Sequence, residues 1–211
     1  YLQGLTFQHI NLLAEGSHGD HRLHVTARGP TISGQLALHG TLKGSTWRGT
    51  LATLDLEPQG MPGWRLQKPS QLSYNDGATS LSELCLSAGD PQLCVTAKQD
   101  KLGNLDASYR LHALPLALLL NAAGDAELPM RADGMLEGNG KIRRSAVGAL
   151  SGNASISSAQ GSITYTDRAD APLLRYDRLS LNAELSPTSQ RIDVHGGLDD
   201  GGRMDGQITI S

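Results

Sequence analysis

Residues 32–42, which read ISGQLALHGTL, decide the fold class of this chain. Their even positions carry apolar side chains or glycine, whereas their odd positions carry mostly polar side chains. Because successive side chains of a β-strand point to opposite faces, this period of two predicts a strand with one wet face. Strands of this kind form antiparallel sheets whose other face is kept from water.

The same alternation recurs along the chain and predicts about 13 to 16 strands. Further segments with this pattern are residues 23–27, 105–111, 128–136, 179–185, 192–196 and 204–210. Turn-forming residues lie between the expected strands, at 16–20, 75–77, 89–91, 139–140 and 199–202. The continuous apolar run after Pro115 departs from this pattern and predicts one short helix near residues 114–123. The expected fold is therefore all-β with one short helix, and we treat residues 1–211 as a single segment of a longer protein.

The composition supplies little bulk for the interior of such a fold. The chain has 25 glycines and a single Phe, and aromatic residues make up 4% of it. The core of a two-sheet sandwich is about 10 Å thick and needs large side chains to fill it. An elongated curved antiparallel sheet with an apolar groove fits this composition as well as a closed sandwich does. The pattern alone leaves both architectures open.

Charge and length exclude several functional classes. The formal net charge is −3, and Arg143-Arg144 is the longest run of basic residues, so the basic stripe of a nucleic-acid-binding protein is missing. The longest apolar run, residues 114–120, is far shorter than the roughly 18 residues that span a bilayer. We therefore expect neither a nucleic-acid partner nor a membrane-crossing segment within these residues.

Motifs that carry chemistry are also missing. The sequence contains no nucleophile elbow, no P-loop and no dinucleotide-binding fingerprint. His18, His21 and His24 are three residues apart, and a strand places such residues on opposite faces, so we interpret them as surface histidines rather than metal ligands. Residues 199–205 lack the ligand spacing of a calcium loop. We expect no enzyme, no catalytic residue, no cofactor and no metal site.

The two cysteines predict a disulfide. If a hairpin turns about Gly89-Asp90, Cys85 lies opposite Cys94, and opposed residues of an antiparallel pair are within disulfide range. Pro91 cannot donate the hydrogen bond that closes a two-residue loop, so we expect a loop of about four residues. The same register places both sulfurs on one face of the hairpin and the flanking apolar side chains on the other. A structural disulfide indicates an oxidising compartment.

The alternation also predicts which side chains face inward. Trp64 shares parity with Leu66, and Trp47 shares parity with Gly49 and Leu51, so both Trp side chains are expected to point inward. Ordinary packing and partial lining of a groove are both open for them. The positions that we expect to line an apolar groove are Leu36, Leu38, Trp64, Leu66, Leu84, Leu86, Leu93, Val95, Met130, Leu136, Leu181, Val194 and Ile208.

Several landmarks occur in one order along the chain. They are the segments at 16–21, 44–51 with Trp47, 64–69 with Trp64 and Pro69, the Cys85 and Cys94 pair, and Leu114-Pro115-Leu116. Together they resemble the TamB family, the large periplasmic component of the translocation and assembly module of Gram-negative bacteria. The order of Trp, Pro and the Cys pair is the most specific part of the resemblance.

The resemblance implies a fold, a location and partners. It implies a β-taco, which is a long sheet folded into a hydrophobic groove, in a periplasmic protein anchored in the inner membrane by an N-terminal helix outside these residues. It also implies work with TamA, an outer-membrane barrel that engages the far C-terminus of such chains. The implied role is envelope biogenesis, described both as assembly of autotransporters and outer-membrane proteins and as passage of phospholipid between the membranes.

Three functions are compatible with the sequence. An apolar groove that conducts phospholipid needs continuous apolar surface rather than a specific site. A chaperone-like groove would receive β-segments of unfolded outer-membrane proteins, by strand addition or by covering their apolar side. A plain spacer built as a solenoid would show a fixed repeat period, and the sequence has none.

Overall fold

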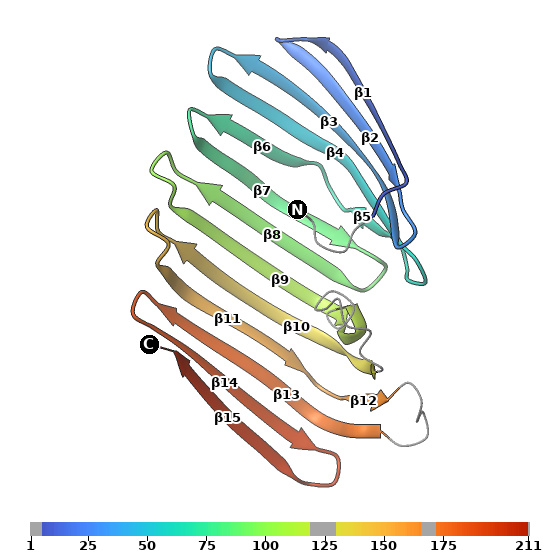
Figure 1. The fold of residues 1–211 in the computed structure, drawn as a ribbon, viewed down its shortest axis with the longest axis vertical. Helices are drawn as coiled ribbons and strands as arrows, with labels where there is room; N and C mark the ends of the chain where they lie inside the picture. The colour runs from blue at the N-terminus through green and yellow to red at the C-terminus, as the bar shows by residue number, and fades with distance from the viewer. Residues whose placement is uncertain (1–5, 119–129, 166–171, 211) are drawn as a thin grey trace. The chain divides into compact units, whose positions relative to one another are not determined.

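Fifteen strands form one antiparallel sheet in the computed structural model, which describes residues 6–118, 130–165 and 172–210. The strands follow one another in chain order, except that two places in the sheet are shared (Figure 1). Both β5 and β6 pair with β4 and β7, and both β11 and β12 pair with β10 and β13. The all-β expectation is confirmed, and the number of strands falls within the expected range.

The chain divides into two compact units, which we describe separately. Unit 1 comprises residues 1–89 and 94–107, and unit 2 comprises residues 90–93 and 108–211. The strands that lie mainly in unit 1 are β1 (His9–Ser17), β2 (Asp20–Arg28), β3 (Ile32–Lys43), β4 (Thr46–Pro58), β5 (Trp64–Leu66), β6 (Ser70–Asn75), β7 (Ala78–Ser87) and β8 (Gln92–Gln99). Those that lie mainly in unit 2 are β9 (Leu105–Pro115), β10 (Met130–Arg144), β11 (Leu150–Ser158), β12 (Gly161–Tyr165), β13 (Pro172–Ser186), β14 (Ser189–Leu198) and β15 (Arg203–Ile210).

A β-bulge sets which residues of β4 share a face. In the pairing of β3 with β4, Ala37 lies opposite Thr53, whereas Leu38 lies opposite Leu51, so Ala52 has no partner. The extra residue shifts the alternation by one position. Odd residues up to Leu51 and even residues from Leu54 onward therefore point to the same side of the sheet.

Most of the expected turns join consecutive strands. The turn at Asp76-Gly77 has positive φ at both residues, as a tight hairpin requires, and residues 199–202 connect β14 to β15. The expected turn at Asn139-Gly140 is wrong, because both residues lie inside β10. Gly140 is buried under the ring of Tyr109, and a Cβ there would lie 2.5 Å from Cε1 of that ring. The glycine therefore lets a neighbouring side chain pack closely against the strand, and it does not mark a change of chain direction.

Glycines in both units make room for aromatic rings in this way. In unit 1, the Trp47 ring covers Gly40 and Gly49, neither of which could carry a Cβ without a clash. In unit 2, Tyr176 lies against Gly134 and Gly161, and its hydroxyl is 3.0 Å from Oγ of Ser158. A few aromatic rings laid on glycines thus supply bulk that the composition otherwise lacks.

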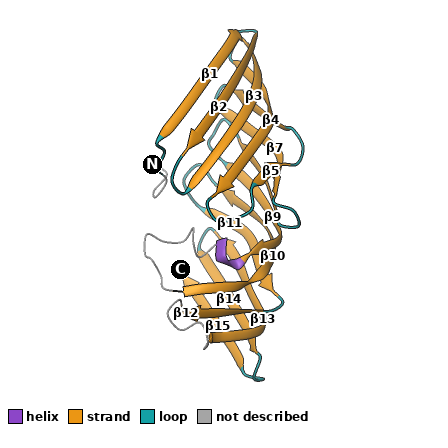
Figure 2. Ribbon diagram, turned by 90° about the vertical axis from the view of Figure 1, so that its right-hand side faces the viewer, coloured by secondary structure: helices purple, strands orange, loops and turns teal. Residues whose placement is uncertain are grey.

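The expected helix near residues 114–123 is only partly present in the described chain. Residues 116–118 are helical and are coloured purple in Figure 2, and residues 119–123 lie outside the described ranges. Leu114 and Pro115 belong to the end of β9 instead. The strand persists because Glu137 of β10 accepts a hydrogen bond from the backbone N–H of Ala113 at 2.9 Å, and proline is tolerated at a strand end. Within the described ranges, no helix is long and apolar enough to cross a membrane.

The Cys85–Cys94 disulfide is confirmed. The two Cα atoms are 4.1 Å apart, and β7 and β8 are joined by the four residues 88–91, as expected. Both cysteines are buried, with exposed fractions of 3% and 5%. Leu86 lies opposite Leu66, so Cys85, the preceding residue, points to the other face of β7.

Removal of this disulfide is expected to loosen the hairpin without unfolding the chain. The bond closes a loop between residues nine positions apart, and a loop this short stabilises the fold by only about 2 to 3 kcal/mol. The Cys85→Ser/Cys94→Ser variant should lose that much in urea unfolding, and a reductant should lower the stability of the natural chain but not of the variant. Two reactive thiols in the native, unreduced chain would contradict the bond.

Candidate functional site

The apolar face of unit 1 is built from aligned residues of β2, β3 and β4. Three rows cross these strands, and opposed residues in each row share a face. The rows are Leu23, Leu38 and Leu51; Val25, Leu36 and Leu54; and Ala27, Gly34 and Leu56. β1 continues the last two rows with Leu12 and Ile10, which are 61% and 65% exposed. We call this surface the unit 1 apolar face.

A hydrophobic pocket of about 280 Å³ lies at one end of the unit 1 apolar face. Its lining is Phe7, Val25, Ala27, Ile32, Ser33, Gly34, Gln35, Leu36, Leu54 and Leu56. Gly34 packs closely against the next strand, because a Cβ there would lie 3.1 Å from Cδ2 of Leu56 and closer still to the Asp55 carbonyl. For scale, an apolar cavity of about 150 Å³ holds benzene. The pocket therefore has the volume and the chemistry for a hydrocarbon group.

The opposite end of the same face carries amphipathic side chains. Nε1 of Trp47 donates a hydrogen bond to Nε2 of His21 at 2.8 Å, and the two rings stack with centroids 6.3 Å apart. Tyr74 lies opposite Trp47 in the β4–β6 pairing and is 46% exposed. His21 is partly buried on this face, whereas His18 and His24 are exposed, as expected for surface histidines.

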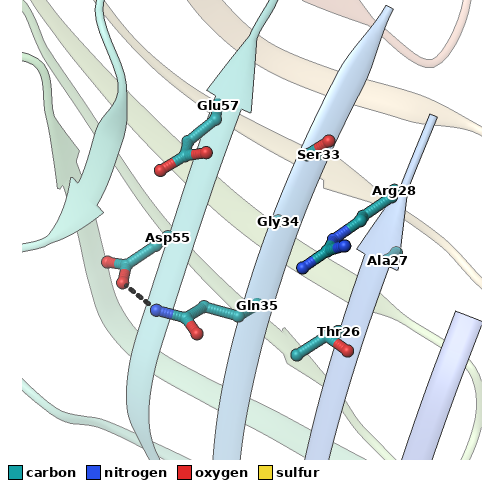
Figure 3. A pocket seen from close by; sticks show the side chains of 8 residues that line it. All are labelled: Thr26, Ala27, Arg28, Ser33, Gly34, Gln35, Asp55 and Glu57. Carbon is teal, nitrogen blue, oxygen red and sulfur yellow. Dashed lines mark hydrogen bonds between the residues drawn. The ribbon is translucent and has the colours of Figure 1, made fainter. Parts of the chain in front are cut away.

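The other face of these strands is polar. Nε2 of Gln35 donates a hydrogen bond to Asp55 at 2.8 Å, and Thr50 bonds Gln71 at 3.1 Å. A shallow pocket of about 200 Å³ lies on this face, and its lining includes the acidic residues Asp55 and Glu57 and the basic residue Arg28 (Figure 3). The change from apolar to polar therefore occurs between adjacent residues of one strand.

Unit 2 has an apolar face of the same construction. Its rows cross β10, β11, β13, β14 and β15, and each apolar residue or glycine lies opposite another. One row is Gly138, Ile156, Leu181, Val194 and Gly206, and the next is Gly140, Ala154, Ala183, Ile192 and Ile208. Leu181 and Ile208 are 36% and 55% exposed. We call this surface the unit 2 apolar face.

Charged and amide side chains cover the opposite face of unit 2. Asp193 accepts hydrogen bonds from Nε2 of Gln207 at 2.8 Å and from the Arg191 guanidinium at 2.9 Å. These donors, Gln207 first, hold the pKa of Asp193 below its usual range. Glu137 of β10 accepts a hydrogen bond from the backbone N–H of Ala113 and another from the ring of His112, both on β9. These two bonds, the backbone one first, lower the pKa of Glu137. The carboxylates of this face therefore stay ionised, which keeps it wet.

The structure aligns most of the expected lining residues within each unit, and it places Leu93 and Val95 only as the neighbours of Cys94 on β8. Leu36 and Leu38 belong to the rows of the unit 1 apolar face, and Trp64 and Leu66 join it because Trp64 lies opposite Leu56. Leu84 and Leu86 lie on the Leu66 side of β7, and Leu93 and Val95 flank Cys94. In unit 2, Leu181 and Val194 share one row and Ile208 lies in the next, and Met130 and Leu136 lie on the same strand as Gly138 with the same parity. A role of these residues in binding cargo stays a prediction.

Sequence reasoning missed residues at both ends of the unit 1 apolar face. Leu54 and Leu56 line the pocket only because the bulge at Ala52 reverses their parity, and Phe7 precedes the first strand. Tyr74 and His21 join the face through strand pairing. Aligning the two strand sequences at positions 34, 36, 54 and 56 would have placed apolar residues or glycine opposite one another. That alignment was the signal for the parity of Leu54 and Leu56.

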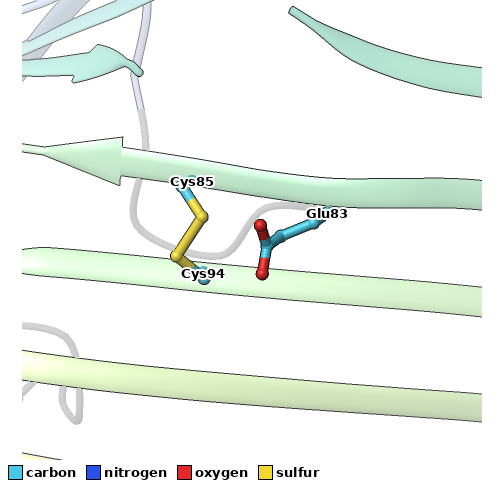
Figure 4. Close-up of side chains that lie close together, drawn as sticks. All are labelled: Glu83, Cys85 and Cys94. Carbon is cyan, nitrogen blue, oxygen red and sulfur yellow. A yellow bond between two sulfur atoms is a disulfide. The ribbon is translucent and has the colours of Figure 1, made fainter. Parts of the chain in front are cut away.

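Glu83, Cys85 and Cys94 form a close group of metal-ligating residue types among those the structure describes. Figure 4 shows the three side chains together, with the two sulfurs joined in the disulfide. A disulfide sulfur is not a thiolate and is a poor metal ligand. Glu83 pairs instead with Nζ of Lys68 at 3.0 Å.

Comparison with known proteins supports the family resemblance. No solved structure matches the chain. A family model described as the TamB N-terminal domain matches residues 1–211, which is the whole chain. The chain therefore belongs to the TamB family.

Proposed function

We propose that this chain shields the acyl chains of phospholipids on its apolar faces as the lipids move between the inner and outer membranes. TamB-family proteins are non-enzymatic components of the translocation and assembly module, work with TamA and serve in biogenesis of the Gram-negative envelope. The proposal adds the cargo to that role. It also retains, for the whole protein, a periplasmic position with an anchor in the inner membrane, and contact with TamA through residues outside this chain.

The observation that carries the proposal is an apolar face left exposed within each unit. A soluble protein normally covers rows of Leu, Ile and Val with a second layer, because exposed apolar area costs about 25 cal/mol per Å². Here Ile10, Leu12 and Ile208 on the edge strands remain more than half exposed, and Leu181 on the interior strand β13 is 36% exposed. Exposed apolar patches of this kind mark binding surfaces. An acyl chain covers such rows without needing any fixed polar partner.

The pocket beside Phe7 favours lipid over protein cargo. Its walls are almost wholly hydrocarbon, and it offers no arrangement of side-chain donors and acceptors for a peptide backbone. A bound backbone would lose its hydrogen bonds to water there, which costs several kcal/mol for each unpaired group. A hydrocarbon chain carries no such cost.

A second function, strand addition by unfolded outer-membrane proteins, is favoured by the edges of the sheet. β1 and β15 each pair with one neighbour in the described chain, and every residue of both strands is exposed. Edges of this kind accept an additional strand. Under this alternative, the cargo would bind the edge backbone and not the apolar faces.

Mass spectrometry of the purified chain tests the proposal. Organic extracts of the protein made in a Gram-negative host should contain phospholipid, and Leu36→Lys should lower the amount about tenfold, because an ammonium on the apolar face must lose water to an acyl chain. The matched control is Gln35→Lys, which places the same charge one residue away on the polar face, beside Asp55. Lipid-free natural protein that binds an unfolded β-barrel segment would overturn the proposal in favour of strand addition.

A further inference from the structure

The two ends of the unit 1 apolar face differ in chemistry along the direction of the strands. At the end near the turns at 18–19 and 44–45 lie the imidazole of His21 and the rings of Trp47 and Tyr74, which are apolar with a polar atom at the tip. At the other end is the pocket beside Phe7, lined by Ile32, Leu54 and Leu56. The face is therefore graded from amphipathic to hydrocarbon.

Rings with a polar tip are the side chains that settle where a membrane meets water. Trp and Tyr are enriched at that depth because the ring is apolar and the N–H or O–H is wet. Trp47 is held in place by its hydrogen bond to His21, and Tyr74 next to it remains 46% exposed. This end of the face thus reproduces the interface between lipid head groups and acyl chains.

The distance between the two ends suits one phospholipid. Trp47 and Leu56 are nine positions apart on β4, and one of the intervening residues, Ala52, is the bulge. Eight strand steps of about 3.3 Å give about 26 Å. One leaflet of a bilayer, head groups included, is about 20 to 22 Å thick, half of the full 40 to 45 Å. A single lipid laid along the strands would therefore cover most of the distance from the aromatic end to the pocket, whose lining already includes Leu54.

We propose that unit 1 binds a diacyl phospholipid along its strands, with the head group at His21, Trp47 and Tyr74 and the acyl-chain ends in the pocket formed by Phe7, Ile32 and Leu56. This inference rests on the proposed function and adds an orientation to it. The head group stays in water at the aromatic end, and the methyl ends occupy the apolar pocket of about 280 Å³ beside Phe7. Every lipid on this unit then points the same way along the strands.

The two Trp residues of the chain report on the two ends. Trp47 marks the aromatic end, and Trp64 lies opposite Leu56 at the pocket end. Trp64→Phe leaves only the first reporter, and Trp47→Phe leaves only the second. Bromine quenches tryptophan fluorescence at short range, so phospholipids brominated either near the head group or near the terminal methyl locate each part of the lipid.

The orientation predicts opposite responses from the two single-Trp proteins. With Trp47 alone, lipid brominated near the head group should quench at least about twofold more than lipid brominated near the methyl end, since Trp marks the depth of the head-group boundary. With Trp64 alone, the order should reverse. Equal quenching by the two lipids, or the same order in both proteins, would overturn the orientation while leaving lipid binding intact. Absence of quenching in both proteins, together with absence of extracted lipid, would overturn the proposed function itself.

Photo-crosslinking in the natural chain covers the case in which Trp64→Phe, a change at a buried side chain, fails to fold. A phospholipid with a diazirine at the methyl end should label the peptides that contain Phe7 and Leu54–Leu56. The same lipid with the diazirine beside the glycerol should label the peptides that contain Leu72 and Tyr74. Interchanged or uniform labelling would overturn the orientation.

Discussion

Gly140→Val is expected to destabilise the chain by about 3 kcal/mol, although valine is among the best strand-forming residues. A Cβ at position 140 would lie 2.5 Å from the Tyr109 ring and 2.9 Å from the carbonyl oxygen of Asn153. The ring is tied by its hydroxyl, which donates to the carbonyl of Ser155 at 3.3 Å, and the Asn153 carbonyl belongs to the backbone of β11. Neither neighbour can move away without breaking other contacts. Thermal melting should fall by roughly 6 to 12 °C for a chain of this length.

Gly206→Val is the matched control. Gly206 is also a strand glycine of unit 2, but nothing lies within 4 Å of a Cβ built there. The same substitution should then be neutral or stabilise the chain by about 0.5 kcal/mol through its strand propensity. Tyr109→Leu combined with Gly140→Val should restore part of the loss, because residues in contact are not additive. Equal effects of the two valines would show that the ring does not need the glycine.

Leu181→Arg is expected to stop function while leaving the fold. Leu181 lies in the middle of the unit 2 apolar face, between Ile156 and Val194, and is 36% exposed. The substitution forfeits about 1 to 2 kcal/mol of apolar burial, which corresponds to a melting shift of a few degrees. A guanidinium in the path of an acyl chain must be desolvated each time a lipid passes, and we expect lipid transfer to fall about tenfold or more.

Asn182→Arg provides the comparison on the polar face. Asn182 follows directly on the same strand, is exposed, and lies opposite Asp193, so the new charge meets an acid in water. The two proteins should melt at similar temperatures, and only the Leu181 variant should fail to restore envelope integrity in cells. Unfolding of the Leu181 variant would indicate a filled core at this position, and normal function would exclude apolar cargo on this face.

Much of the fold follows from local sequence because a strand has a side-chain period of two. The alternation at residues 32–42 placed nearly all of β3, and that at residues 179–185 placed the second half of β13, with the inward residues of both segments. The Cys85–Cys94 register followed from the same parity together with the turn at Gly89-Asp90. These features depend on neighbours within about a dozen residues.

The failures all involve contacts between distant residues. Asn139-Gly140 has the composition of a turn, and only Tyr109 on the adjacent strand reveals that Gly140 is a packing position. His21 has the parity of Leu23 and Val25, so alternation places it on the apolar face, but its hydrogen bond to Trp47, which is 26 residues away, depends on strand pairing. The bulge at Ala52 depends on how β3 and β4 align, so the parity of Leu54 and Leu56 could not be read along one strand. The pocket could not be predicted either, because Leu54 and Leu56 form part of its lining.

The disulfide also acts as a check on assembly. If one strand of a hairpin shifts by one residue, its apolar side chains point to water and its polar side chains point to the apolar face. The backbone hydrogen bonds change little. Such a slip between β7 and β8 would move one sulfur away from the other, so the bond could not close. In an oxidising compartment, oxidation therefore traps chains whose hairpin is correctly aligned and leaves misaligned chains with free thiols. The free-thiol content of newly made protein thus measures how often β7 and β8 pair in the wrong register.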